Sequence, residues 1–283
     1  MNIASVSQPS LLRKSGVFLL FLIVESLVFA IITLSPYLPK DMLIGFHAGF
    51  TTVCLTLSLL LRKSKKGKPF WPVFFAFFVA GAAVLISALF SNDLLRLLKQ
   101  TVATPQGIAT AKFSESILRI IPILVLMPIA GFDWRSMYLK MGKIRTWLPI
   151  AISALVVFPA LSFFLLSNGQ AGVLNKLLPL WPWILLFVLC NGFMEELLYR
   201  GILLKRYEPF IGKNSSVILT AVVFAIMHTQ VTYASQMIQF ILIVTALSLI
   251  WGVLIQKTES LWGAVLFHAA ADTLIIFGAF ASM

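Results

Sequence analysis

Charge is scarce in this chain of 283 residues, and that scarcity excludes most classes of soluble protein. Only 11% of the residues are charged and just ten are acidic, whereas 60% are hydrophobic and the mean hydropathy is +0.98. A soluble domain carries about 25% charged residues because its surface faces water. The chain is therefore neither an ordinary soluble enzyme nor a disordered chain. We expect a polytopic membrane protein whose main partner is the lipid bilayer.

Cysteine and the common catalytic signatures are also scarce or missing. The two cysteines, Cys54 and Cys190, lie in apolar stretches and form no CxxC pair, so they indicate neither a disulfide framework nor a cysteine-based metal site. The chain has no HExxH zinc-protease sequence, no GxSxG nucleophile sequence and no phosphate-binding loop. ATP use and a covalent serine or cysteine mechanism are therefore unsupported.

What the sequence does contain is a series of apolar spans. A helix needs about 20 apolar residues to cross the hydrocarbon of a bilayer. Nine stretches approach that length: 16–34, 43–61, 70–90, 116–132, 147–166, 180–204, 217–230, 237–256 and 260–280. They predict an all-α fold, a polytopic bundle of about eight or nine transmembrane helices. The stretch 91–112 is the longest polar connection, and we expect an interfacial helix within it.

The basic residues are distributed unevenly between the two ends of these spans. Of the 22 lysines and arginines, only Lys40, Arg96, Lys99, Lys112, Arg119 and Lys176 fall on one side. The other sixteen would face the cytoplasm by the positive-inside rule, which places the N-terminus there. This topology accounts for the net charge of +12 without a nucleic-acid partner. The short loops and composition indicate an integral protein of a bacterial plasma membrane.

Seven ionisable side chains interrupt the spans. Such groups are costly in a bilayer and usually serve function. Five lie in the last third of the chain. We expect the other two, Glu25 and His47, to pair with each other. The set is Glu25, His47, Glu195, Glu196, His228, His268 and Asp272.

The spacing of these residues predicts specific pairs. Glu196 and Arg200 are four residues apart, share a helix face and can form an ion pair. Glu195 points about 100° away around the helix and lacks a local partner, which suits a general base. His268 and Asp272 share a face in the same way. The alternative is that these groups form only helix-end salt bridges and hydrogen bonds that shield them from lipid.

Depth along the helices favours a common site. At about 1.5 Å per residue, Glu195, His228 and His268 fall into one depth band in the cytoplasmic half of the bilayer. Asn191 lies one turn before Glu195, and we expect it to form a hydrogen bond nearby.

A carboxylate and two imidazoles in one band can hydrolyse an amide. One carboxylate with one imidazole can deprotonate water, and a second imidazole with a polar neighbour can stabilise an oxyanion. Glu195, His228 and His268 could instead hold zinc or another divalent metal. We expect no cofactor, and the metal site stays the alternative.

The three polar motifs together resemble a known family. Glu195-Glu196…Arg200, Phe224…His228 and His268…Asp272 match EExxxR, FxxxH and Hxxx(N/D) of the CPBP intramembrane proteases. That family includes type II CAAX prenyl endopeptidases and bacteriocin-processing or immunity proteins. The resemblance covers about residues 180–280. It implies a catalytic core over 176–283, joined in one membrane domain to helices of unassigned role over 1–175.

The resemblance also implies a role for each motif residue. Glu195 would activate water with His228 as its partner, and His268 with Asp272 would form the oxyanion side. Glu196 and Arg200 would hold the first motif in shape, and Phe224 would pack near the site. Such proteins are often labelled metalloproteases, but we favour a metal-independent mechanism.

The expected function is therefore an intramembrane endopeptidase. Its substrate would be a membrane-associated or prenylated-type peptide or protein. The third motif ends in Asp272 where the prenyl-protease branch typically has asparagine, which weakens the case for a prenylated substrate. The alternatives are a non-enzymatic immunity or scaffold protein with the same fold, and a proton-coupled transporter.

Overall fold

The computed structural model describes residues 11–31, 37–167, 172–231 and 236–283, and this part of the chain is almost entirely helical. No strand occurs in it, so the predicted all-α class is confirmed for these residues. The predicted first span ends at residue 34, and its residues 32–34 lie outside the described part. The α-helices are α1 (Leu11–Ala30), α2 (Lys40–Lys63), α3 (Trp71–Leu97), α4 (Pro105–Ile129), α5 (Ile144–Ser167), α6 (Gly172–Leu177), α7 (Trp181–Glu195), α8 (Leu204–Ile211), α9 (Lys213–Met227), α10 (Met237–Thr258) and α11 (Trp262–Ala281).

Six stretches of the described chain are long and apolar enough to cross a membrane. They are Lys40–Lys63, Lys68–Leu97, Ile144–Leu166, Gly172–Ile211, Met237–Thr258 and Trp262–Ala281. The other three predicted spans fall short of that standard for identifiable reasons. Three charged residues interrupt α1 and three interrupt α4. Helix α9 has only 15 residues. The protein is a polytopic helical membrane bundle.

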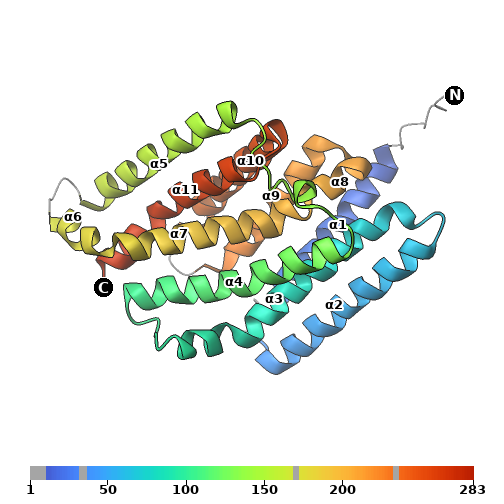
Figure 1. The fold of residues 1–283 in the computed structure, drawn as a ribbon, viewed down its shortest axis with the longest axis horizontal. Coiled ribbons are helices and arrows are strands. Elements are labelled where there is room, and N and C mark those ends of the chain that lie inside the picture. The colour runs from blue at the N-terminus through green and yellow to red at the C-terminus, as the bar shows by residue number, and fades with distance from the viewer. Residues whose placement is uncertain (1–10, 32–36, 168–171, 232–235) are drawn as a thin grey trace.

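The helices pack as two rows (Figure 1). Neighbouring helices of the first row follow the order α2, α3, α4, α7, α11 and α5. The second row consists of α1, α9 and α10, and it meets the first where α1 packs on α3 and α10 packs on α11. Helix α7 therefore runs through the middle of the bundle between α4 and α11. This position brings the Glu195–Glu196 sequence next to the histidine of α11.

The polar stretch 91–112 does not form the interfacial helix expected from the sequence. Its first part continues α3 to Leu97, and its last part begins α4 at Pro105. Thr104 caps α4 by accepting a hydrogen bond from the backbone N–H of Gly107, at 3.1 Å. Of the charged residues that made this stretch look like a loop, Asp93 and Arg96 belong to α3 and Lys112 to α4, and Lys99 lies between these two helices.

Glu25 and His47 do not pair with each other, contrary to the expectation from sequence. The side chains of both are fully buried. Glu25 Oε2 accepts a hydrogen bond from the hydroxyl of Tyr207 at 2.8 Å, and His47 Nε2 lies 2.9 Å from the backbone oxygen of Gly81. Each group found a closer partner on another helix, which spacing along the sequence could not reveal.

Candidate active site

A π-helical turn opens the site. Helix α7 ends at Glu195, and residues Glu196–Gly201 continue it as a π-helix, a form that is rare and often found at functional sites. The two adjacent glutamates have different surroundings as a result. The side chain of Glu196 is 0% exposed, whereas that of Glu195 is 15% exposed.

Glu196 contacts both Arg200 and His268. Its Oε1 accepts from Arg200 Nη1 at 2.6 Å and lies 2.8 Å from His268 Nδ1. The predicted ion pair between Glu196 and Arg200 is therefore confirmed. A carboxylate paired with a guanidinium can only accept, so Nδ1 of His268 is the protonated ring nitrogen that donates to it. Nε2 of His268 is left to face the rest of the site.

Glu195 and Asp272 flank that second ring nitrogen, and Asn191 contacts Asp272. His268 Nε2 lies 3.5 Å from Glu195 Oε2 and 3.5 Å from Asp272 Oδ1. The other oxygen of Asp272 accepts from Asn191 Nδ2 at 2.9 Å. The hydrogen bond expected of Asn191 thus goes to Asp272 of α11. One imidazole is held between two carboxylates that come from different helices.

Close packing of α7 on α11 makes these distances possible. Gly192 lies one turn before Glu196, and a Cβ atom there would stand 3.0 Å from the backbone oxygen of Val265 and 3.1 Å from the backbone nitrogen of Ala269. Small residues let membrane helices approach closely at such points. A side chain at this position would force the two helices apart and separate His268 from both glutamates.

An aromatic wall fixes His268 and Arg200 from the side of α9 and α10. The ring of Trp251 stacks on His268 with centroids 4.1 Å apart and planes inclined by 8°. The guanidinium of Arg200 lies 4.9 Å from the ring centre of Phe224 and 5.4 Å from that of Trp251. Arg200 also donates to the hydroxyl of Ser248. These contacts hold the cation by cation–π attraction and hydrogen bonding in surroundings without solvent.

His228 occupies a different place from the one expected. It begins a short 3₁₀ turn after α9, and its Nδ1 donates to the backbone oxygen of Phe224 at 2.8 Å. Within the described chain, no hydrogen bond or ion pair joins it to Glu195, and the imidazole beside Glu195 is that of His268. The ring of Phe224 lies 4.4 Å from the His228 ring and 5.8 Å from the His268 ring. Phe224 is thus a neighbour of both histidines.

Polar atoms without a partner gather in this cluster. Of the ten buried side-chain nitrogen and oxygen atoms that lack a hydrogen bond among the described residues, five belong to it. They are Asn191 Oδ1, Glu195 Oε2, Glu196 Oε2, Arg200 Nε and Trp251 Nε1. Burying such groups without partners costs free energy, so their concentration marks a place suited to water or a polar ligand.

The alternative ligand set for a metal is not assembled. Among the residues that the structure describes, no group of three or more His, Cys, Asp or Glu side chains is arranged to hold a metal ion. Glu195 and His268 are adjacent, but His228 has its hydrogen bond and ring contacts elsewhere. The donors present therefore do not fit the set Glu195, His228 and His268.

Several residues near the cluster went unnoticed in the sequence. Ser248 and Trp251 look like ordinary residues of an apolar helix, and nothing in their spacing marks them. Lys112, Glu115 and Arg119 form an ion-pair triad on α4, with Lys112 Nζ 2.7 Å and Arg119 Nη2 2.6 Å from the carboxylate of Glu115. Their spacing of three and four residues was the signal that could have revealed the triad.

The comparisons with known proteins agree with the position of this cluster. A family model described as type II CAAX prenyl endopeptidase Rce1-like matches residues 177–274, about a third of the chain. These residues are therefore similar to the Rce1-like family. The match includes all of α7, α9 and α10 and the part of α11 that carries His268 and Asp272. The Rce1-like family is a peptidase family, and the match supports the resemblance to the CPBP proteases. The searches of curated proteins and of solved structures found no match.

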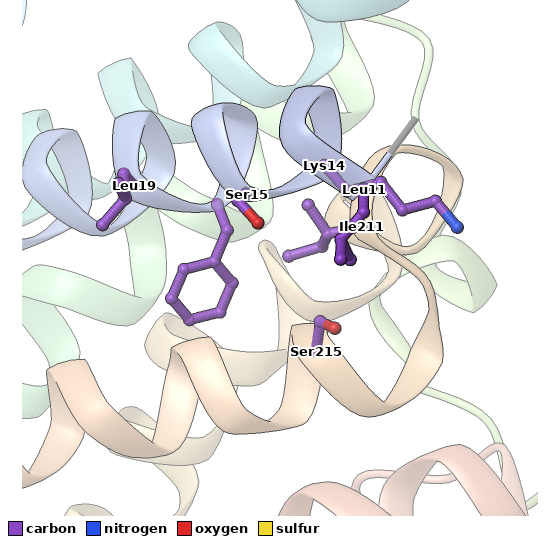
Figure 2. Close-up of a pocket in the computed structure, with 7 residues that line it drawn as sticks. Leu11, Lys14, Ser15, Leu19, Ile211 and Ser215 are labelled. Carbon is purple, nitrogen blue, oxygen red and sulfur yellow. The ribbon is translucent and has the colours of Figure 1, made fainter. Parts of the chain in front are cut away.

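A separate pocket lies away from the polar cluster around His268. It has a volume of about 380 Å³ and lies between α1 and the junction of α8 and α9 (Figure 2). Leu11, Lys14 and Phe18 line it from α1, and Ile211 and Ser215 from the other side. None of the residues that surround His268 lines this pocket, so it is not part of the candidate site.

Proposed function

We propose that the protein is a CAAX-type intramembrane endopeptidase that uses Glu195 to activate water. The observation that carries the proposal is the arrangement around His268. One ring nitrogen is fixed by the buried Glu196–Arg200 pair, and the other faces Glu195 at 3.5 Å. This arrangement lies within residues 177–274, which match the model of a peptidase family.

Hydrolysis would need two proton transfers. Glu195 takes a proton from a water molecule as the water oxygen forms a bond to the substrate carbonyl carbon. The carbon–nitrogen bond of the resulting tetrahedral species then breaks, and the proton passes from Glu195 to the leaving amine. The products are a new carboxylate and a free amine, and no covalent enzyme intermediate forms.

The remaining residues would position these groups or stabilise charge. His268 lies beside Glu195, Glu196 and Trp251 hold His268 in place, and Arg200 holds Glu196. Asn191 and Asp272 complete the polar wall. Nδ1 of His228 donates to the backbone oxygen of Phe224, so Nε2 of the neutral ring is an acceptor, and the protonated ring donates from Nε2 to the oxyanion. This role replaces that of direct partner to Glu195.

We also propose that the protein lies in a bacterial plasma membrane with its N-terminus in the cytoplasm. The uneven distribution of lysine and arginine supports this orientation. The site would then open toward the cytoplasmic half, where a membrane-anchored peptide can reach it.

A cleavage assay with matched variants tests the proposal. Purified full-length protein in lipid nanodiscs receives a pool of farnesylated and unmodified peptides, and mass spectrometry identifies the products. We expect cleavage by the wild type and by Glu259→Gln, whose carboxylate lies in the exposed turn between α10 and α11. We expect none by Glu195→Gln.

Two results would contradict the proposal. Cleavage by Glu195→Gln at the wild-type rate would remove Glu195 from the mechanism. Complete inactivity of a well-folded wild type toward the whole pool would favour a non-enzymatic immunity or scaffold role.

A further inference from the structure

The ion-pair triad of α4 lies beside the candidate site, outside the Rce1-like region. Helices α4 and α7 run in the same direction and stay in contact over at least two turns. Lys112 Nζ lies 5.7 Å from the ring centre of Phe187, Ser116 donates to the backbone oxygen of Cys190 at 3.2 Å, and Arg119 Nη1 lies 3.5 Å from Met194 Sδ. Arg119 therefore reaches the residue next to Glu195, whereas Lys112 lies nearer the start of α7.

The triad carries one surplus positive charge. Lys112 and Arg119 share the single carboxylate of Glu115, and the three side chains are 21%, 22% and 26% exposed, respectively. The Nε atom of Arg119 is buried and has no hydrogen-bond partner among the described residues. Both cations contact α7, the helix that ends at Glu195. A partly accessible cation therefore lies along the helix that carries Glu195.

A substrate with a free C-terminus needs such a cation. The cluster around His268 holds the carboxylates of Glu195, Glu196 and Asp272 but only one guanidinium, that of Arg200. A terminal carboxylate that approaches these acids meets electrostatic repulsion, which a neighbouring cation offsets. A CAAX sequence ends the chain, so its carboxylate lies three residues beyond the cysteine.

The spacing along α7 fits that length. Seven residues separate the level of Met194 from that of Phe187, which is about 10 Å along the helix. Three residues of extended chain also span about 10 Å. A peptide cleaved beside Glu195 and extended along α7 would therefore bring its terminal carboxylate to Lys112.

We propose that Lys112 binds the C-terminal carboxylate of the substrate, with Glu115 and Arg119 holding the lysine in place. The inference rests on the proposed function, because it names the substrate class of that same site. It makes the enzyme selective for peptides cut near a free C-terminus. Lys112 is then a specificity residue contributed by the N-terminal helices.

A binding experiment separates this inference from the reaction itself. Two fluorescent, farnesylated peptides of one CAAX-type sequence differ only in ending as the acid or as the amide. Fluorescence anisotropy measures their affinities for the Glu195→Gln protein in nanodiscs, alone and combined with Lys112→Gln, Lys112→Arg or Lys40→Gln. Lys40 is an exposed cation at the start of α2 and serves as the matched control.

We expect the acid to bind about tenfold more tightly than the amide, as a charge-assisted hydrogen bond provides. Lys112→Gln should remove this preference while leaving the amide affinity unchanged, whereas Lys112→Arg should keep part of it and Lys40→Gln all of it. Thermal unfolding of each variant verifies that the fold is intact.

Three results would overturn the inference. The first is equal affinity for the acid and the amide, which includes no binding of either peptide. The second is an acid preference that survives Lys112→Gln. The third is an equal loss of affinity for both peptides in Lys112→Gln. The last would show that Lys112 only balances the charge of Glu195 and Asp272. An acid preference without cleavage by the wild type would instead keep the carboxylate site and reject the proposed reaction.

Discussion

The two adjacent glutamates should respond in opposite ways to the same substitution. Glu195→Gln removes a carboxylate that is 15% exposed and whose nearest ion-pair atom lies 3.5 Å away, beyond a good hydrogen bond. Glu196→Gln removes a fully buried carboxylate that accepts from both Arg200 and His268. The first change should abolish cleavage with little effect on stability, and the second should reduce both.

The expected magnitudes follow from what each change leaves behind. Removing one partner of a buried ion pair costs about 3–5 kcal/mol, because the other charge stays buried without its partner. Stacking of Arg200 on Phe224 and its hydrogen bond to Ser248 persist and place Glu196→Gln near the lower end, about 3 kcal/mol. Glu195→Gln breaks no hydrogen bond and should change the free energy of unfolding by less than about 1 kcal/mol.

The assay combines unfolding and cleavage on the same samples. Denaturant titration of each variant in a mild detergent, followed by tryptophan fluorescence, gives the free energy of unfolding, and peptide cleavage in nanodiscs gives the rate. Glu259→Gln is the control for both, since its carboxylate is exposed and pairs with Lys140, which is not part of the cluster. Equal destabilisation by Glu195→Gln and Glu196→Gln, or full activity of either variant, would refute the reasoning.

Four further changes test other contacts of the site. Gly192→Ala should destabilise the bundle by about 1–3 kcal/mol and reduce cleavage, because its Cβ meets the backbone of α11, whereas Gly278→Ala, with open space around it, should do neither; unfolding and cleavage assays measure both. Trp251→Leu should slow cleavage about tenfold through loss of the stack on His268, and Trp251→Phe should slow it less; equal rates for the two variants would argue against stacking. His228→Ala should lower the cleavage rate while the free energy of unfolding stays within about 1 kcal/mol, because among the described residues it makes a hydrogen bond only to its own helix; wild-type activity would remove this histidine from the mechanism. Prolonged treatment with a chelator should leave the cleavage rate unchanged, since the histidines and acids of the described chain form no ligand set, and loss of activity restored by zinc would contradict that.

Periodicity and motif order carried much of the prediction. Apolar runs revealed where helices lie, because a helix in lipid must be apolar over its length. Spacing of four residues revealed the Glu196–Arg200 pair, since such residues share a helix face whatever the rest of the fold does. The same logic failed at 91–112, where Asp93, Arg96 and Lys112 gave transmembrane-length helices the composition of a loop.

Composition and neighbours along the chain were enough to establish the class of protein, the helices and the order of three polar motifs. Packing between helices established which imidazole faces Glu195, which groups hold Glu25 and His47, and that Trp251 and Lys112 lie beside the site. Those choices depend on how closely α7 approaches α11 and on the register of α4 along α7. Contacts between helices far apart in sequence leave no periodic signal, so packing alone brings the residues of the site together.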